Sequence, residues 1–144
     1  MVPWNDTNPW TLNTFWWEGV DGSRVMGIVP PGHFIGTVDP DDIHTQWRSF
    51  SDRATVGETL HIFGWGDGGG GPDPEEIESG LRYRDCIGMP RMEYTTCEKA
   101  FDSIREAARG VDLPVLADEV YLEAHRGTFT NKGRLKKLNR RGEY

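Results

Sequence analysis

An aspartate beside a run of glycines is the segment of this 144-residue chain whose residue types best suit chemistry. Asp67 is followed by four consecutive glycines, beginning with Gly68, and then by Pro72. Glycine adopts backbone conformations closed to other residues and lets a ligand approach the main chain closely. The tract therefore indicates a tight active-site loop that presents the Asp67 carboxylate.

The glycine tract has two other interpretations. A phosphate-binding loop would need a Gly-Lys-Ser/Thr ending or the spacing Gly-x-Gly-x-x-Gly, and the tract has neither. A flexible linker is the plainer alternative. The tract stands, however, between a predicted strand and a capped helix, with no other low-complexity residues around it.

A second acidic group, Asp118, Glu119 and Glu123, lies near His125 at the end of the last predicted strand. Alternate residues of a strand share a face, so Glu119, Glu123 and His125 can point the same way. Such a trio can ligate a metal, but salt bridges with Arg126 and the basic segment beyond it are the plainer interpretation. Paired carboxylates are also what glycoside hydrolysis uses, one as acid and one as nucleophile or base.

Two adjacent tryptophans, Trp16 and Trp17, precede the carboxylates of Glu18 and Asp21. Aromatic faces beside carboxylates suit sugar rings, which have an apolar C–H face and hydroxyl edges. A core aromatic pair is the alternative. Because neighbouring residues of a strand point to opposite faces, one tryptophan can be buried while the other is exposed.

The elements that position these residues alternate along the chain. Short apolar runs predict strands at 14–20, 24–29, 60–65 and 89–94, and residues 113–116 open a last one. Asp-Pro pairs at 39–40 and 73–74 predict helix starts, Thr95 with Glu98 has the spacing of a capping box, and a basic helix is predicted at 132–141. The order indicates an α/β fold of parallel βαβ units. In that class, ligands bind at the carboxyl ends of the strands, where Asp67 lies.

The overall charge excludes some classes of partner. The chain has 16 Lys and Arg against 23 Asp and Glu, for a net charge of -7, which argues against nucleic acid. Its one basic cluster, at 134–141, is interpreted as a solvated or packed helix face, with a ligand-binding patch as the alternative. Neither a secretion signal nor a membrane helix is expected. Cys86 and Cys97 form no disulfide framework, and a cytoplasmic location is expected.

Several segments together resemble glycoside hydrolase family 38 α-mannosidases, particularly the cytosolic and microbial branch. They are WND at 4–6, FWWEG at 15–19, DGSRV at 21–25, PPG at 30–32, GWGD at 64–67 with the glycines and Pro72, LPV at 113–115, EVYLE at 119–123, HRGTFT at 125–130, KKLNR at 136–140 and Glu143. They occur in the family's order across essentially the whole chain, which is more specific than any one of them.

The resemblance implies a (β/α)7-type barrel that leads into the first helix of a helical bundle. Residues 1–130 would form the C-terminal part of the barrel, and residues 131–144 would start the bundle. The activity implied is hydrolysis of terminal α-mannosidic bonds with retention. Asp67 would be the general acid or a sugar ligand. The implied substrate-binding residues are Trp16, Trp17, Asp21, Gly68, Glu119, His125 and Arg126.

The family's zinc-ligand segments and its nucleophile segment are not in this sequence. Zn2+ is therefore expected in the intact enzyme, with no metal ligand in this chain, and the chain alone is expected to be inactive. The implied partners are an α-mannoside and the remainder of a mannosidase chain. A homo-oligomer is a further expectation, because a slice of barrel exposes strand edges and apolar faces. The alternatives are a non-catalytic carbohydrate-binding or structural module, or one half of a split enzyme.

Overall fold

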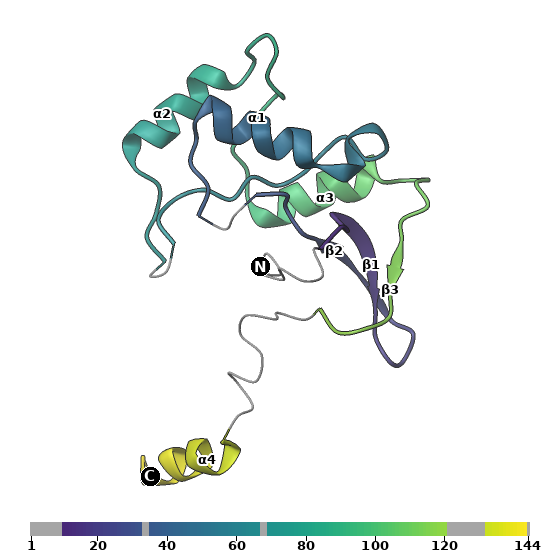
Figure 1. Ribbon diagram of the computed structural model, residues 1–144, viewed down its shortest axis with the longest axis vertical. Coiled ribbons are helices and arrows are strands. Elements are labelled where there is room, and N and C mark those ends of the chain that lie inside the picture. The colour runs from purple at the N-terminus through teal and green to yellow at the C-terminus, as the bar shows by residue number, and fades with distance from the viewer. Residues whose placement is uncertain (1–9, 33–34, 67–68, 121–131, 144) are drawn as a thin grey trace. The chain divides into compact units, whose positions relative to one another are not determined.

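The computed structural model describes residues 10–32, 35–66, 69–120 and 132–143. The described elements are β1 (Thr14–Glu18), β2 (Arg24–Ile28), α1 (Pro40–Ser49), the 3-10 turn η1 (Ser51–Ala54), α2 (Pro74–Tyr83), α3 (Cys97–Ala107), β3 (Val115–Leu116) and α4 (Gly133–Gly142) (Figure 1). The chain divides into two units. The larger contains Thr11–Asp118, and the described part of the smaller contains Trp10, residues 119–120 and α4.

Strands β1 and β2 form the predicted hairpin, although β1 ends at Glu18 rather than at residue 20. The turn needs a positive φ, which Gly22 provides at 80°. The amide of Gly19 donates to the carbonyl of Ser23 at 2.8 Å and closes the turn. Trp16 pairs with Met26 across the hairpin, so the register places their side chains on one face.

Strand β3 joins the other edge of β1, which gives the order β2-β1-β3. β1 pairs with β2 antiparallel and with β3 parallel, and the amide of Trp16 donates to the carbonyl of Pro114 at 2.9 Å. Helices α1, α2 and α3 all lie in the connection between the two parallel strands. The sheet is thus mixed, with one parallel pair of the kind that the sequence predicts.

Two predicted strands are wrong. At 60–65 the structure has only a single parallel bridge, between Phe63 and Gly36, and at 89–94 it has no strand. Pro90 has no amide hydrogen for a ladder. The hydroxyl of Tyr94 instead donates to the carbonyl of Glu76 at 2.8 Å, which attaches this segment to α2. The described residues form one three-stranded sheet, and the barrel stays a prediction.

The helix starts follow the predicted capping chemistry closely. Oδ1 of Asp39 accepts hydrogen bonds from the amides of Asp41 and Asp42, both at 2.9 Å. These bonds and one from Thr37 hold the pKa of Asp39 below its usual value. Helix α2 begins after Asp73 as predicted. The cap of α3 is Thr96, one residue later than predicted.

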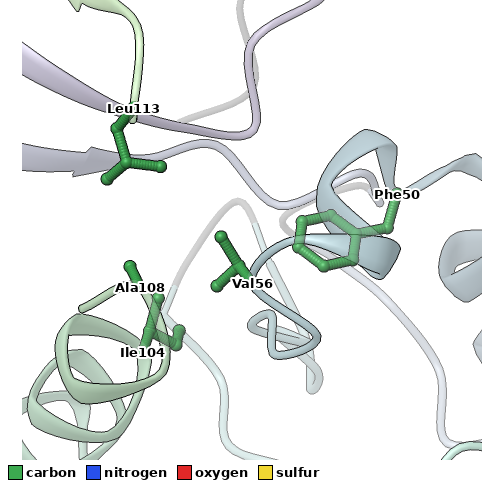
Figure 2. Packing of buried hydrophobic residues seen from close by; sticks show 5 residues of the cluster. All are labelled: Phe50, Val56, Ile104, Ala108 and Leu113. Atoms are coloured by element: carbon green, nitrogen blue, oxygen red, sulfur yellow. The ribbon is translucent and has the colours of Figure 1, made fainter. Parts of the chain in front are cut away.

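The core lies between α3, the end of α1 and the residues that lead into β3. It is formed by five buried residues, Phe50, Val56, Ile104, Ala108 and Leu113 (Figure 2). Figure 2 shows Ile104 and Ala108 on α3, with Val56 between them and Phe50. Partly buried side chains of the hairpin, among them Trp16 and Met26, pack against this cluster.

Helix α4 is the basic helix that the sequence predicts, and it begins after Lys132. Leu135 and Leu138 are both more than half exposed, so the helix has no buried residue of its own. Among the described helices, none has the length and apolar character that crossing a membrane requires.

Gly80 is a position where a side chain has no room. A Cβ there would lie 2.0 Å from the hydroxyl oxygen of Tyr94, whose ring is attached to α2 by its hydrogen bond. We expect Gly80→Ala to lower the free energy of unfolding by about 1–3 kcal/mol, because Tyr94 must move. Urea unfolding of the chain, followed by tryptophan fluorescence, measures this. Gly142→Ala is the control, since a Cβ at that helical glycine meets nothing within 4 Å; equal destabilisation by both would contradict the steric explanation.

Candidate functional site

The glycine tract is closed at its base by a hydrogen bond. The amide of Trp65 donates to the carbonyl of Gly71 at 3.4 Å, which joins the two ends of the tract. Gly64 has a φ of 104°, so the chain enters the tract in a conformation that favours glycine. Asp67 and Gly68 lie outside the described residues, and their predicted roles stay predictions. Their flanking residues form a defined loop base.

Trp65 is fixed beside the tract by helix α2. Its indole N–H donates to Oδ2 of Asp73, the N-cap of α2, at 3.0 Å. The amide of Asp73 in turn donates to the carboxylate of Glu76 at 3.1 Å, as in a capping box. The tryptophan ring is held by this bond while 66% of the residue stays exposed. An exposed aromatic surface, oriented by one hydrogen bond, therefore lies two residues before Asp67.

Gly66, directly before Asp67, and Gly70, within the tract, lie where no side chain fits. A Cβ on Gly66 would lie 2.3 Å from Cγ2 of Ile35, and one on Gly70 would lie 2.8 Å from Cβ of Trp65. Gly71, by contrast, has nothing within 4 Å of a Cβ. The tract is thus rich in glycine partly because its base is crowded, which supports a loop over a flexible linker.

Trp16 and Trp17 face opposite sides of the sheet, as the strand pattern predicts. Trp16 packs against the core cluster, with Met26 on the same face. Trp17 is 42% exposed, and its indole N–H donates to the carbonyl of Asp118 at 2.9 Å. Trp17 is therefore the better placed of the two to stack on a ligand, whereas Trp16 has a packing role.

Asp21 is committed to the hairpin turn. Its Oδ1 accepts from the amide of Ser23 at 3.0 Å and from the Ser23 hydroxyl at 2.6 Å. These two bonds lower the pKa of Asp21 from its ordinary value and keep it ionised. The predicted substrate contact from Asp21 stays a prediction, and the contact that the structure shows is local to the turn.

The other predicted site residues belong to the smaller unit or lie outside the described residues. Glu119 is exposed and belongs to the smaller unit, whereas Trp17 belongs to the larger one. Glu123, His125 and Arg126 lie outside the described residues. The predicted pocket wall formed by Asp67, Glu119 and His125 therefore stays a prediction.

A shallow groove runs between the hairpin and the last turns of α3. It is lined in part by Trp16, Met26, Arg105 and Arg109. Both arginines form short-range ion pairs, Arg105 with Asp102 within α3 at 2.7 Å and Arg109, in the turn after α3, with Glu106 at 2.5 Å. The groove therefore presents balanced charges, with no acid and base set apart for catalysis.

The described residues do not fit a zinc ion. Among them, no group of three or more His, Cys, Asp or Glu side chains is arranged to hold a metal. Zn2+ prefers such a set, with at least three protein ligands in catalytic sites.

The contact between Trp65 and Asp73 is not among the contacts predicted from the sequence, where Asp73 is only a helix start. Its carboxylate also anchors the indole of Trp65, eight residues earlier. An aromatic residue three positions before a glycine tract, with an acidic N-cap two positions after it, is the signal that indicates such a closed loop.

Comparisons with known proteins agree on one family. A family model described as the glycosyl hydrolases family 38 N-terminal domain matches residues 1–119. The chain is 32% identical over 143 residues to Alpha-mannosidase 2C1 of Homo sapiens, and 34% identical over 151 residues to the Alpha-mannosidase of Saccharomyces cerevisiae. Each alignment covers 99% of this chain and 14% of the relative.

A third relative, Alpha-mannosidase G of Dictyostelium discoideum, is 33% identical over 140 residues, which is 96% of this chain and 13% of the relative. The chain therefore spans about a seventh of the length of the relatives that it matches. The match to the family model covers most of the chain. This chain belongs to glycosyl hydrolase family 38 and carries sequence of that family's N-terminal domain.

Proposed function

We propose that this chain is part of an α-mannosidase that hydrolyses terminal α-mannosidic bonds with retention, and that it has no turnover by itself. The observation that carries the proposal is the similarity to three α-mannosidases across 96–99% of the chain. The closed base of the glycine tract supports it further, because a catalytic carboxylate needs a defined position.

In this proposal Asp67 is the general acid. A retaining glycosidase needs one carboxylic acid that protonates the departing oxygen and then, as carboxylate, takes a proton from the attacking water. The second carboxylate, the nucleophile, comes from the remainder of the enzyme. Trp17 and Trp65 have exposed aromatic rings on which sugar rings can stack. Each ring is oriented by a hydrogen bond from its indole N–H to a protein oxygen.

The fold that we propose for the intact enzyme is a (β/α)7-type barrel followed by a helical bundle. The parallel pairing of β1 with β3, with three helices in the connection, supports a βαβ arrangement. A cytoplasmic location is part of the proposal. Cys86 and Cys97 are both free thiols, as expected in a reducing compartment.

A graft into a relative tests the function. In the grafted enzyme, this chain replaces the stretch that it matches in the Saccharomyces cerevisiae α-mannosidase. We expect the grafted enzyme to hydrolyse 4-methylumbelliferyl α-mannoside, whereas the chain alone does not. Proton NMR of the first product should show α-mannose, as retention requires.

The same experiment separates the alternatives. A grafted enzyme that folds with the thermal stability of its parent but has no activity would contradict the enzymatic proposal. It would favour a non-catalytic module, which calorimetry of the isolated chain with mannose then tests. Activity restored by mixing the chain with the remainder of the relative, supplied as separate polypeptides, would favour a split enzyme.

A further inference from the structure

The side chain of His61, in the segment that leads to the glycine tract, contacts Gln46 of helix α1 and the backbone of Thr37, which precedes that helix. These three residues are called the clamp. Nδ1 of His61 is 2.9 Å from Oε1 of Gln46, and its Nε2 is 3.0 Å from the carbonyl oxygen of Thr37. Gln46 is 7% exposed, and its Nε2 donates to Oδ1 of Asp42 at 3.0 Å. That bond fixes the orientation of the Gln46 amide and leaves its oxygen facing the imidazole.

The clamp is crowded on the sides that the structure describes. A Cβ on Gly32 would lie 2.0 Å from Cδ of Gln46, and one on Gly36 would lie 3.0 Å from Cε1 of His61. The ring of Phe63 stacks on the imidazole at a centroid distance of 6.4 Å and an interplanar angle of 9°. The ring of His61 is therefore held by packing and by its contacts with two acceptor oxygens, to one of which each neutral tautomer donates its single N–H.

Backbone hydrogen bonds connect the clamp to the base of the tract. The amide of Gly36 donates to the carbonyl of Ile62 at 3.1 Å, and the amide of Gly64 donates to the carbonyl of Gly36 at 3.3 Å. The next residue, Trp65, makes the bond to Gly71 that closes the tract. Consecutive residues from His61 to Trp65 are thus fixed one after another, and a displaced imidazole would shift the loop base.

We propose that His61 is a positioning residue, which sets the base of the glycine tract and through it the acid assigned to Asp67. This inference rests on the proposed function. Proton transfer needs the acid within hydrogen-bond reach of the departing oxygen, and small misplacements of a catalytic group lower the rate steeply. His61 itself is six residues from Asp67 in the sequence and acts only through the loop base.

A comparison of leaving groups tests the role in the grafted enzyme. With 4-methylumbelliferyl α-mannoside, we expect His61→Ala to lower kcat/KM, which reports formation of the glycosyl-enzyme, about tenfold. With 2,4-dinitrophenyl α-mannoside, whose leaving group departs without protonation, we expect kcat/KM to change by no more than about twofold. His44→Ala, which removes the histidine of α1 and leaves the clamp intact, should leave the rates on both substrates unaffected.

Equal losses on the two substrates, or no loss on either, would overturn the proposal. If His61→Ala does not fold, Gln46→Met keeps the imidazole and removes its Nδ1 partner; the same leaving-group pattern supports the role, and its absence overturns it. The failure of Asp67→Asn to lower activity would instead contradict the acid assignment in the proposed function.

Amide exchange in the 144-residue chain tests the clamp without any turnover. We expect His61→Ala to speed exchange of the Gly64 and Trp65 amides about tenfold, because an opened clamp frees their hydrogen bonds. The amide of Ala108 in α3, which donates to Ile104, should exchange at its original rate. Unchanged exchange at Gly64 and Trp65 would overturn the inference whether or not the graft is active.

Discussion

Asp67→Asn is expected to lower kcat/KM of the grafted enzyme on 4-methylumbelliferyl α-mannoside by about 10²- to 10⁴-fold, the range that general acid catalysis supplies. Asparagine has nearly the same size as aspartate but has no acidic proton to give to the departing oxygen. The loss should be much smaller on 2,4-dinitrophenyl α-mannoside, since that leaving group needs no proton. Initial rates on the two substrates measure the difference.

The second half of the reaction gives an independent signature of Asp67. In a retaining mechanism the same carboxylate later activates water against the glycosyl-enzyme. Added azide is an anionic nucleophile that needs no such base, so we expect azide to accelerate the Asp67→Asn enzyme and to yield a mannosyl azide. Asp85→Asn changes an exposed aspartate on the turn after α2 and serves as the control. Activity within about threefold of the parent for Asp67→Asn would remove Asp67 from the acid role.

The helix starts could be predicted from the sequence because capping is local. At the starts of α1 and α2, the acidic residue and the proline lie within one turn of the bonds that they make or permit. Thr95 and Thr96 show the limit of such prediction. Both can cap, and the structure uses Thr96, whose Oγ1 accepts from the amide of Lys99 at 3.5 Å.

The strand predictions succeeded where pairing is local and failed where it is not. The hairpin of β1 and β2 needs only a short turn, and its alternation correctly separated Trp16 from Trp17. Residues 60–65 are apolar enough for a strand, but the partner that the structure gives them is a single bridge to Gly36. An apolar run indicates burial, and its pairing depends on distant residues that periodicity cannot identify.

The contacts of the candidate site show the same division. The conformational demand of the glycine tract could be inferred from composition, and the crowding around Gly66 and Gly70 is consistent with it. Composition could not indicate the bond between Trp65 and Asp73 or the contacts of His61. These contacts join residues 8 to 24 positions apart through side chains. Such contacts follow from tertiary packing and have no fixed sequence spacing.

Phe50→Ala is expected to lower the free energy of unfolding by about 3–5 kcal/mol, the range for a buried phenylalanine. Phe50 is 1% exposed, and its ring lies 5.8 Å from that of Trp47, between α1 and the rest of the core (Figure 2). Its removal costs the transfer energy of the ring and leaves a cavity against Val56. Domains of this size have only about 5–15 kcal/mol of stability, so the variant should be near its unfolding threshold at 37 °C.

Phe101→Ala provides the matched comparison, since Phe101 is on α3 and 37% exposed. A side chain that already contacts water gains less from burial and leaves no closed cavity, so we expect it to cost about 1 kcal/mol. Urea denaturation of both variants, followed by tryptophan fluorescence, gives the two values. Equal costs would mean that Phe50 is not the centre of the packing between α1 and α3. If Phe50→Ala costs about 2 kcal/mol or more beyond Phe101→Ala, the core cluster is a main source of stability for the larger unit. The same cluster then supports the clamp, because Phe50 is the C-cap of the helix that carries Gln46.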